Sequence, residues 1–275
     1  MKRQLGPVTH SVLCALTVVA LVSGTAVAED VAYDMVGSTS RNLVSYSTDA
    51  PEFGSPGDGF QKYTVGVSES IPYAIVDDSA DVYPADTLGI IDSESDFDEF
   101  FGICDIVNDD NTEPLHATWV FDISSAEANV ELHVDLGAMG DFEPDDSYVL
   151  TYQIDGGPVT TFLSAVVDED GSMSYELANG IIVDLDDPLT VDGITLYNDL
   201  QTFSTSISTG SELTVELTSL TDGGSEAFVL RNILVTSYTE PVTGGQPIPT
   251  ASATGIAVMV LLLVAGGVFL LRRMR

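Results

Sequence analysis

Apolar and polar residues alternate in several segments near the middle of the chain. In the segment NVELHVDL (129–136), valine and leucine occupy every second position, and Glu131, His133 and Asp135 stand between them. The same alternation recurs in 147–155 and in 213–218. Because successive side chains of a strand point to opposite faces of a sheet, a period of two predicts strands with one buried and one polar face.

Turn-forming residues separate these segments. The run DGGP (155–158) predicts a tight hairpin, since glycine accepts the positive φ angles that such turns require. The run TDGGS (221–225) predicts a second turn ahead of another strand. No window of twelve residues between 29 and 240 keeps a helical period. We therefore predict an all-β domain over 29–240, a two-sheet β-sandwich of the jelly-roll type.

The segment 68–86 interrupts this regularity. It contains two prolines and many acidic residues, which favours long loops at one edge of the sandwich. Loops on a rigid scaffold are a common place for binding sites. Tyr73 and Tyr83 in this segment are therefore the freest aromatic candidates for contact with a sugar. Trp119 lies in an alternating segment instead and is expected in the core.

The N-terminus predicts a secretory signal peptide over 1–28. Lys2 and Arg3 precede an uncharged apolar run at 12–22, and small residues at 25–28 stand directly before an acidic pair. This three-part order is typical of export signals, and cleavage is expected after Ala28. The apolar run is too short to be a convincing spanning helix.

The C-terminus predicts a transmembrane helix over 251–271. This stretch carries no charge, and a helix of its length crosses the hydrocarbon core of a membrane. Three arginines follow within the basic end, 272–275, which predicts that this end is cytoplasmic and that residues 29 to about 249 lie outside. The protein is thus expected to be exported and held, at least transiently, in the inner membrane by one helix.

A linker with a short proline-containing motif, 241–250, precedes this helix. Ile248, Pro249 and Thr250 in the sequence PIPT resemble the motif of the IPTL-CTERM and PEP-CTERM family of bacterial C-terminal sorting signals. The resemblance implies recognition by a membrane-embedded exosortase-type enzyme, and release or transfer to the cell surface or its polysaccharide matrix. Because Ala251 stands in place of the family's leucine, a plain single-pass anchor is the alternative.

Segments across the domain also resemble the jelly-roll accessory modules of bacterial secreted and surface proteins. These segments are DGFQKY (58–63), IPY (71–73), FFG (100–102), TWVFDI (118–123), AMGDFE (138–143), YQIDGG (152–157) and GSEAFVLRNI (224–233). The resemblance implies the fold and no single activity. Related modules often bind a structural calcium through an aspartate just before the asparagine of the last strand, where this chain has Arg231 before Asn232.

Charge is distributed very unevenly along the chain. All 43 acidic residues lie between Glu29 and Glu240, where Arg41, Lys62 and Arg231 are the only basic residues other than histidine. Nucleic acid is excluded as a partner, because phosphate binding needs clustered Lys and Arg. A solvated acidic surface adapted to high salt explains the composition best, and calcium sites are the alternative.

No catalytic constellation is recognisable in the sequence. His116 and His133 have no His or Cys at zinc-ligand spacing, and the string GGSEA (223–227) lacks the second glycine of a serine-nucleophile turn. There is no P-loop and no dinucleotide fingerprint. Cys104 has no partner cysteine in the domain and is expected to be a small buried residue. We therefore expect no enzymatic activity.

Calcium is the best specific chemical hypothesis. Ca²⁺ takes six to eight oxygen ligands, which acidic loops can supply. Four carboxylates, those of Asp141, Glu143, Asp145 and Asp146, lie in one six-residue segment between two expected strands, and the run DEDG (168–171) offers a smaller set. The first four are the candidate calcium ligands.

These observations favour an exported, non-enzymatic β-sandwich that is displayed on the cell surface or in the extracellular matrix, with a structural or adhesive role. One alternative is a calcium-assisted glycan-binding module, whose partner would be an exopolysaccharide or another glycan. The other alternative is an extracellular hydrolase whose catalytic carboxylates cannot be recognised among so many acids.

Overall fold

The computed structural model describes residues 28–239, apart from residues 50, 68–69, 78–87 and 94. Within these ranges every regular element is a strand, which confirms the all-β prediction. No helix of these residues is long and apolar enough to span a membrane. The expected features that lie outside them are residues 1–27 of the signal peptide, Tyr83, Glu240, the linker with Ile248, Pro249 and Thr250, the helix at 251–271 and the basic end at 272–275.

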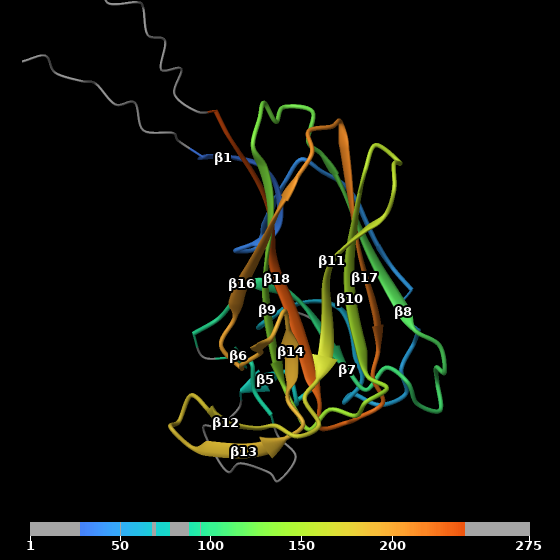
Figure 1. Cartoon of the computed structure of the whole chain (residues 1–275). Coiled ribbons are helices and arrows are strands. Elements are labelled where there is room, and N and C mark those ends of the chain that lie inside the picture. Colours follow the sequence, from blue (N-terminus) through green and yellow to red (C-terminus); the bar gives the residue numbers. More distant parts are fainter. Residues whose placement is uncertain (1–27, 50, 68–69, 78–87, 94, 240–275) are drawn as a thin grey trace, which may run out of the picture. The chain divides into compact units, whose positions relative to one another are not determined.

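The strands follow one another in the order labelled in Figure 1. They are β1 (Ala28–Val36), β2 (Thr39–Arg41), β3 (Leu43–Thr48), β4 (Gly59–Thr64), β5 (Val76–Asp77), β6 (Ile91–Asp92), β7 (Glu99–Cys104), β8 (Leu115–Asp122), β9 (Val130–Met139), β10 (Ser147–Ile154), β11 (Thr160–Val167), β12 (Ser172–Glu176), β13 (Ile182–Asp186), β14 (Leu189–Val191), β15 (Ile194–Thr195), β16 (Gln201–Ile207), β17 (Glu212–Leu220) and β18 (Ala227–Tyr238).

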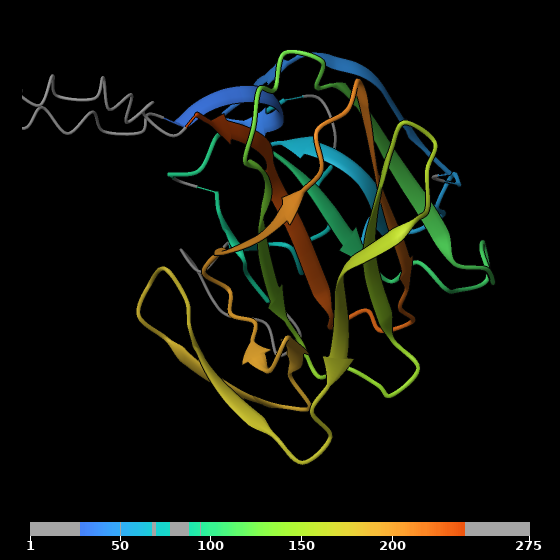
Figure 2. The ribbon, with the colours of Figure 1, turned by 45° about the horizontal axis from the view of Figure 1, so that its top comes forward.

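Two seven-stranded antiparallel sheets form a sandwich, as predicted. Sheet A has the order β16-β9-β18-β1-β2, with β7 also paired to β18 and β4 paired to β7. Sheet B has the order β15-β14-β11-β10-β17-β8-β3. In Figure 1, β16, β9 and β18 lie in one layer and β11, β10, β17 and β8 in the other, and the turned view of Figure 2 keeps these layers apart. The antiparallel ladder β12–β13 and the parallel pair β5–β6 lie outside both sheets.

The main core fills the space between the two sheets. The alternation in β9 turns Val130, Leu132 and Val134 into this core, as the sequence pattern predicts. Trp119 on β8 is fully buried, and its ring lies 5.3 Å from that of Phe101 on β7. The tryptophan is therefore a packing residue, in agreement with its position in an alternating segment.

The predicted hairpin at 155–158 connects β10 to β11. Asp155 and Gly156 both have positive φ, 50° and 66°. The Asp155 carboxylate also accepts hydrogen bonds from the backbone N–H groups of Ser211 and Glu212, each 2.9 Å long. The turn thus ties the β10–β11 end of sheet B to the start of β17.

A second hydrophobic cluster covers part of the outer face of sheet A. Phe100 and Cys104 of β7 point into it, whereas Phe101 and Ile103 of the same strand point into the main core. Tyr175 of β12 packs there as well, together with residues around β5 and β6. Cys104 is buried, as predicted, and this burial raises the pKa of its thiol. Strand β7 is therefore buried on both faces, like the central layer of a three-layer structure.

Close packing at Gly102 and a hydrogen bond to Asp77 hold this second hydrophobic cluster against sheet A. A Cβ atom at Gly102 would come within 2.7 Å of Ile75 Cδ1, so the glycine makes room for the Ile75 side chain against β7. The Asp77 carboxylate accepts a 2.5 Å hydrogen bond from the backbone N–H of Ala178, which follows β12. Over β16, β9, β18 and β1, no strand of the described residues covers the outer face of sheet A.

Candidate metal centre

The connections β9–β10 and β17–β18 bring carboxylates together at one end of the sandwich. Asp146 closes the first connection, because its carboxylate accepts a 2.8 Å hydrogen bond from the backbone N–H of Glu143, and its own N–H donates to the Glu143 carbonyl at 2.9 Å. The second connection is fixed through the Thr221 carbonyl, which accepts from the N–H groups of Ile106 and Val107. Hydrogen bonds within the first loop, and from the β7–β8 connection to the second, therefore hold both loops in position.

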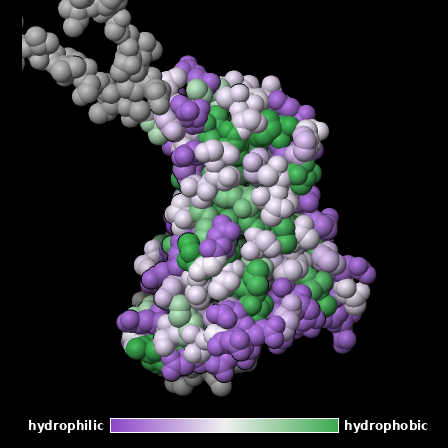
Figure 3. Space-filling view, in the orientation of Figure 1, coloured by the Kyte–Doolittle hydropathy of each residue, from purple (hydrophilic) through white to green (hydrophobic). Residues whose placement is uncertain are grey.

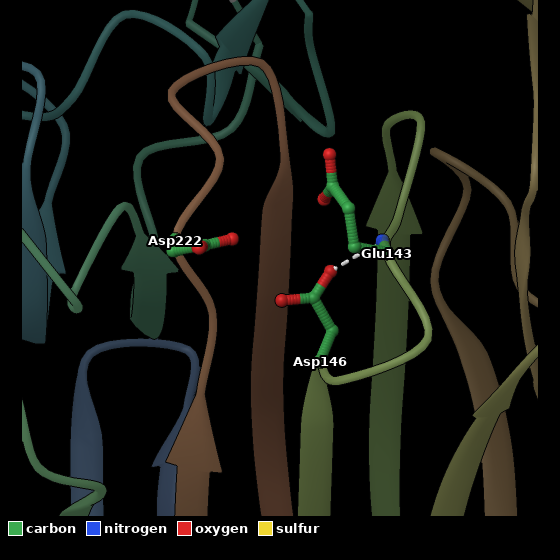
Figure 4. A group of neighbouring side chains, drawn as sticks. All are labelled: Glu143, Asp146 and Asp222. Atoms are coloured by element: carbon green, nitrogen blue, oxygen red, sulfur yellow. Dashed lines mark hydrogen bonds between the residues drawn. The ribbon is translucent and has the colours of Figure 1, made fainter.

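Three carboxylates from these loops face a common space (Figure 4). One oxygen atom each of Glu143, Asp146 and Asp222 lies within 4.8 Å of the other two. Asp146 is buried, while Glu143 and Asp222 are exposed. Oxygen atoms at this spacing could hold a metal ion, and a set without nitrogen or sulfur suits a hard cation such as Ca²⁺ rather than zinc.

A fourth carboxylate, that of Glu226, lies beneath these three. Glu226 is only 2% exposed, and the Thr221 hydroxyl donates a 2.7 Å hydrogen bond to it. Burial first, and then the neighbouring carboxyl groups of Glu143 and Asp146, raise the pKa of Glu226 far above its usual value. Without a cation, Glu226 therefore retains a proton at neutral pH.

Two nearby aspartates, Asp146 and Asp105, also have raised pKa values, each chiefly because of its own burial. Burial also raises the pKa of Asp146. Farther along this end of the sandwich, burial and the nearby charges of Asp58 and Asp222 raise the pKa of Asp105 to about 6. Because the pKa values of Glu226, Asp146 and Asp105 are all raised, these carboxyl groups lose their protons at higher pH than free carboxyl groups do.

No positively charged side chain compensates this cluster within the described residues. Arg41 lies 3.8 Å from Glu29, Lys62 pairs with Asp34 and Glu99, and Arg231 pairs with Asp96 and Asp98 (2.8 Å to Asp98). A buried carboxylate without a counter-charge is costly, and a bound divalent cation removes that cost. The donor set, its burial and its unmatched charge all fit a calcium ion.

The floor of the site is aromatic and rigid. Tyr148 follows Asp146 on β10, and its ring stacks on Phe228 at 4.4 Å with an interplanar angle of 15°. The Tyr148 hydroxyl is buried and has no hydrogen-bond partner among the described residues. Burial, and then the charge of Glu226, raise the pKa of this hydroxyl, which places it close to the acidic cluster.

The predicted ligands are only partly brought together. Glu143 and Asp146 share the cluster, whereas Asp141 and Asp145 lie outside it. Burial, and then the charge of Asp187, raise the pKa of Asp141, so this residue faces a different neighbour. Sequence reasoning missed Asp222 and Glu226, although both lie in or beside the predicted turn at 221–225. The only local signal was the pair of acids that flanks GGS in that turn.

The uncovered part of the outer face of sheet A forms a groove of about 440 Å³. In its polar lining, the Asp135 carboxylate accepts hydrogen bonds from the hydroxyl of Thr202 (2.6 Å) and from the side-chain amide of Asn232. Asn232 has a φ of 53° at an irregularity of β18, which re-aims its side chain. The groove is lined by Ala28, Val36, Glu131, His133, Asp135, Thr202, Asn232, Leu234, Thr236 and Tyr238.

The other polar residues that the sequence singled out are engaged in local contacts. His133 lies 3.0 Å from the Thr236 hydroxyl, and His116 lies 3.1 Å from the Thr218 hydroxyl on sheet B. The run at 168–171 forms a tight turn in which the N–H of Gly171 donates to the Asp168 carbonyl. Tyr73 is 42% exposed.

Hydrophilic and hydrophobic residues are interspersed on the face drawn in Figure 3, and hydrophilic residues dominate its lower end.

No known family model matches the chain, and no curated protein sequence matches it. Similar solved structures include the K3 and K1 cleaved adhesin domains of Lys-gingipain (Kgp) from Porphyromonas gingivalis W83. Their identities are 11% and 8%, each TM-score is 0.36, and the alignments cover 76% and 79% of this chain and 99% of each domain. TmCBM61, in complex with β-1,4-galactotriose, has 10% identity and a TM-score of 0.26 over 50% of this chain and 69% of that chain. At these values no residue role or ligand is transferred.

Calcium should stabilise the protein through Glu226. At a calcium concentration about 100-fold above Kd, the expected gain is about 2.7 kcal/mol, or roughly 5–10 °C in Tm. Glu226→Gln should abolish most of this shift and, in chelator at neutral pH, raise the stability by about 1–3 kcal/mol, because a neutral amide replaces a buried acid. Thermal melting with calcium and with chelator measures both effects. Asp145→Asn is the matched control and should retain the calcium shift; an equal shift in Glu226→Gln would contradict the site.

The raised pKa of the Glu226 carboxyl group also leads us to expect that stability depends on pH. In chelator, native Glu226 keeps a proton that the unfolded chain releases above its ordinary pKa, so the native state binds more protons and stability falls as pH rises. Between pH 5.5 and 7.5 the loss should be up to about 2–3 kcal/mol by urea unfolding. Saturating calcium displaces the proton and should remove most of this slope. The reverse slope in chelator, or an unchanged slope in Glu226→Gln, would show that this residue does not control it.

Proposed function

We propose that the chain is an exported, non-enzymatic β-sandwich of the jelly-roll type that is held at the cell surface or in the extracellular matrix and has a structural or adhesive role. The observation that carries this proposal is the acidic cluster. Its carboxylates, of which Asp146 and Glu226 are buried, bring the β9–β10 and β17–β18 connections together at one centre, which suits a structural cation site. Calcium bound by Glu143, Asp146, Asp222 and Glu226 would brace this end of the sandwich.

Export and display are supported by the composition of the chain. An excess of acidic side chains is tolerated where salt or millimolar calcium screens it, as outside a cell. The expected signal peptide, sorting motif and helix add to this proposal from the sequence. An exosortase-type enzyme would then cut or transfer the tail at the motif 248–250, whereas a plain anchor would leave the chain in the inner membrane.

Replacement of Ile248, Pro249 and Thr250 by alanine separates these two fates. If the motif is a sorting signal, the variant should accumulate at full length in the inner membrane, and the wild type should be found on the surface or in the matrix without the residues beyond about 250. Fractionation followed by intact-mass measurement gives the result. An identical distribution and mass for both proteins would contradict sorting.

Turnover of a polysaccharide or an ester by the purified protein would contradict the non-enzymatic role.

Glycan binding is the second candidate function, and the groove on sheet A favours it. Sugar sites combine a few converging polar groups with apolar surface against which the ring packs. The groove offers the carboxylate of Glu131 and the imidazole of His133 beside Leu234 and Tyr238. It contains no Lys or Arg, which favours a neutral or amino sugar over a uronic acid.

A glycan array with the purified protein tests this second function. Binding to a neutral or amino sugar is expected, and Glu131→Ala should weaken it by roughly tenfold or more, since one hydrogen bond to a charged group is lost. Glu216→Ala, on the outer face of sheet B, is the matched control and should leave binding unchanged. No binding to any sugar, or equal loss in both variants, would remove the groove as a glycan site.

A further inference from the structure

Lys62 is the only lysine between residues 29 and 240, and it lies at the edge of the main core. Its side chain is 16% exposed, and that of its partner Asp34 is 2% exposed. The Lys62 Nζ atom contacts Asp34 Oδ2 and lies 3.4 Å from Glu99 Oε1. In a domain with so few cations, one half-buried amine thus meets two carboxylates.

The fold brings these three residues together from three strands. Strands β1 and β7 pair with successive parts of β18, so the end of β1 meets the beginning of β7. There the N–H of Glu99 donates a 3.2 Å hydrogen bond to the Gly37 carbonyl. Strand β4 pairs with β7, with Lys62 opposite Phe101, and therefore reaches the same point.

Backbone geometry turns Asp34 inward. Met35, the next residue, has a φ of 56°, in the left-handed region that a methionine rarely adopts. This conformation breaks the alternation of β1, so that the neighbours Asp34 and Met35 are both buried. A strained residue that persists in this way has to be held by its surroundings. The carboxylate is thereby presented to Lys62 and not to solvent.

An aromatic ring lies against the lysine of this pair. Lys62 Nζ lies 4.4 Å from the ring centroid of Tyr46, and this ring packs 5.4 Å from that of Trp119. The contact with Asp34 does not have hydrogen-bond geometry, since Oδ2 has no hydrogen-bond partner among the described residues although it touches the amine. The amine is therefore next to the carboxyl group without the directional bond of an optimal ion pair.

We propose that Lys62 and Asp34 condense into an intramolecular isopeptide bond, with Glu99 as the proton carrier. Proton transfer within the pair gives a neutral amine and a carboxylic acid. The lone pair of Nζ attacks Cγ of Asp34, Glu99 takes a proton from Nζ and returns it to the departing hydroxyl group, and one water molecule leaves. One C–N bond forms and one C–O bond breaks, without oxidant, cofactor or activated donor.

Placement and burial both favour this reaction. Groups held in reacting geometry reach effective molarities of about 10⁵–10⁸ M, which compensates for the usual preference for hydrolysis in water. The low exposure of Asp34 and Lys62 limits the access of water to the amide once it has formed. The product would link β1 covalently to the β4–β7 pair. Because Cys104 is the only cysteine of the domain, no disulfide within it can supply such a link.

Peptide mapping of the full-length, denatured protein tests the cross-link without any variant. After digestion with chymotrypsin, the peptides that contain Asp34 and Lys62 should run as one covalent pair whose mass is the sum of the two minus one water. Recovery of both peptides separately, at their sequence masses, would overturn the proposal. The readout does not involve calcium, glycan binding or surface display, so its failure leaves the proposed function standing.

Variants then assign the roles of the three residues. Lys62→Arg should abolish the cross-link while keeping a positive charge, and its retention there would overturn the assignment of Lys62. Asp34→Asn should still cross-link, but with loss of ammonia instead of water. Glu99→Gln should lower the linked fraction at least tenfold in freshly made protein. Complete linkage in a folded Glu99→Gln variant would overturn the role given to Glu99.

Discussion

The scarcity of positive charge is the constraint on which much of this structure depends. Between residues 29 and 240 the chain has 43 acidic side chains but, histidine apart, only three basic ones, and each of these three is committed to particular carboxylates. Lys62 and Arg231 each join two acids beside β7 and β18. The acids around Glu226 have to share protons or take a cation from solvent. The proposed calcium site and the expected pH dependence of stability are thus two consequences of one imbalance.

Sheet A has two different outer surfaces, one sealed by packing and one that forms a groove. Beside β7 the outer face is sealed by β12, β13 and the β5–β6 segment, which gives a second core around Tyr175 and Phe100. Farther along, over β9 and β18, the same face is polar and forms the groove around Asp135. Rigid packing on one part supports side-chain placement on the other, as a binding surface needs. The acidic cluster acts at the end of the sandwich, where the connecting loops would otherwise be the weakest part.

Local patterns predicted the strands well and the long-range sites only in part. Alternation placed Leu132 and Trp119 in the core, and glycine chemistry placed the turn at 155–158, because both depend on neighbours in sequence. Glu143 and Asp146 were found since they lie in one acidic run. Asp222 and Glu226 come from another connection, and no local pattern says which loops meet at a sandwich end. The position of Lys62 could not be predicted either, because a lysine in a strand normally points to solvent and the buried Asp34 stands beside a left-handed Met35 that no sequence pattern indicates.

Calorimetric titration of calcium into chelator-treated protein tests the central claim most directly. Run in two buffers of different protonation enthalpy, it counts both the ions bound and the protons released. The account predicts one saturable site per chain whose occupation releases protons, and it predicts that Glu226→Gln removes the proton release. Absence of a saturable site, or binding without proton release that is unchanged in Glu226→Gln, would show that the buried carboxylates do not form a cation site.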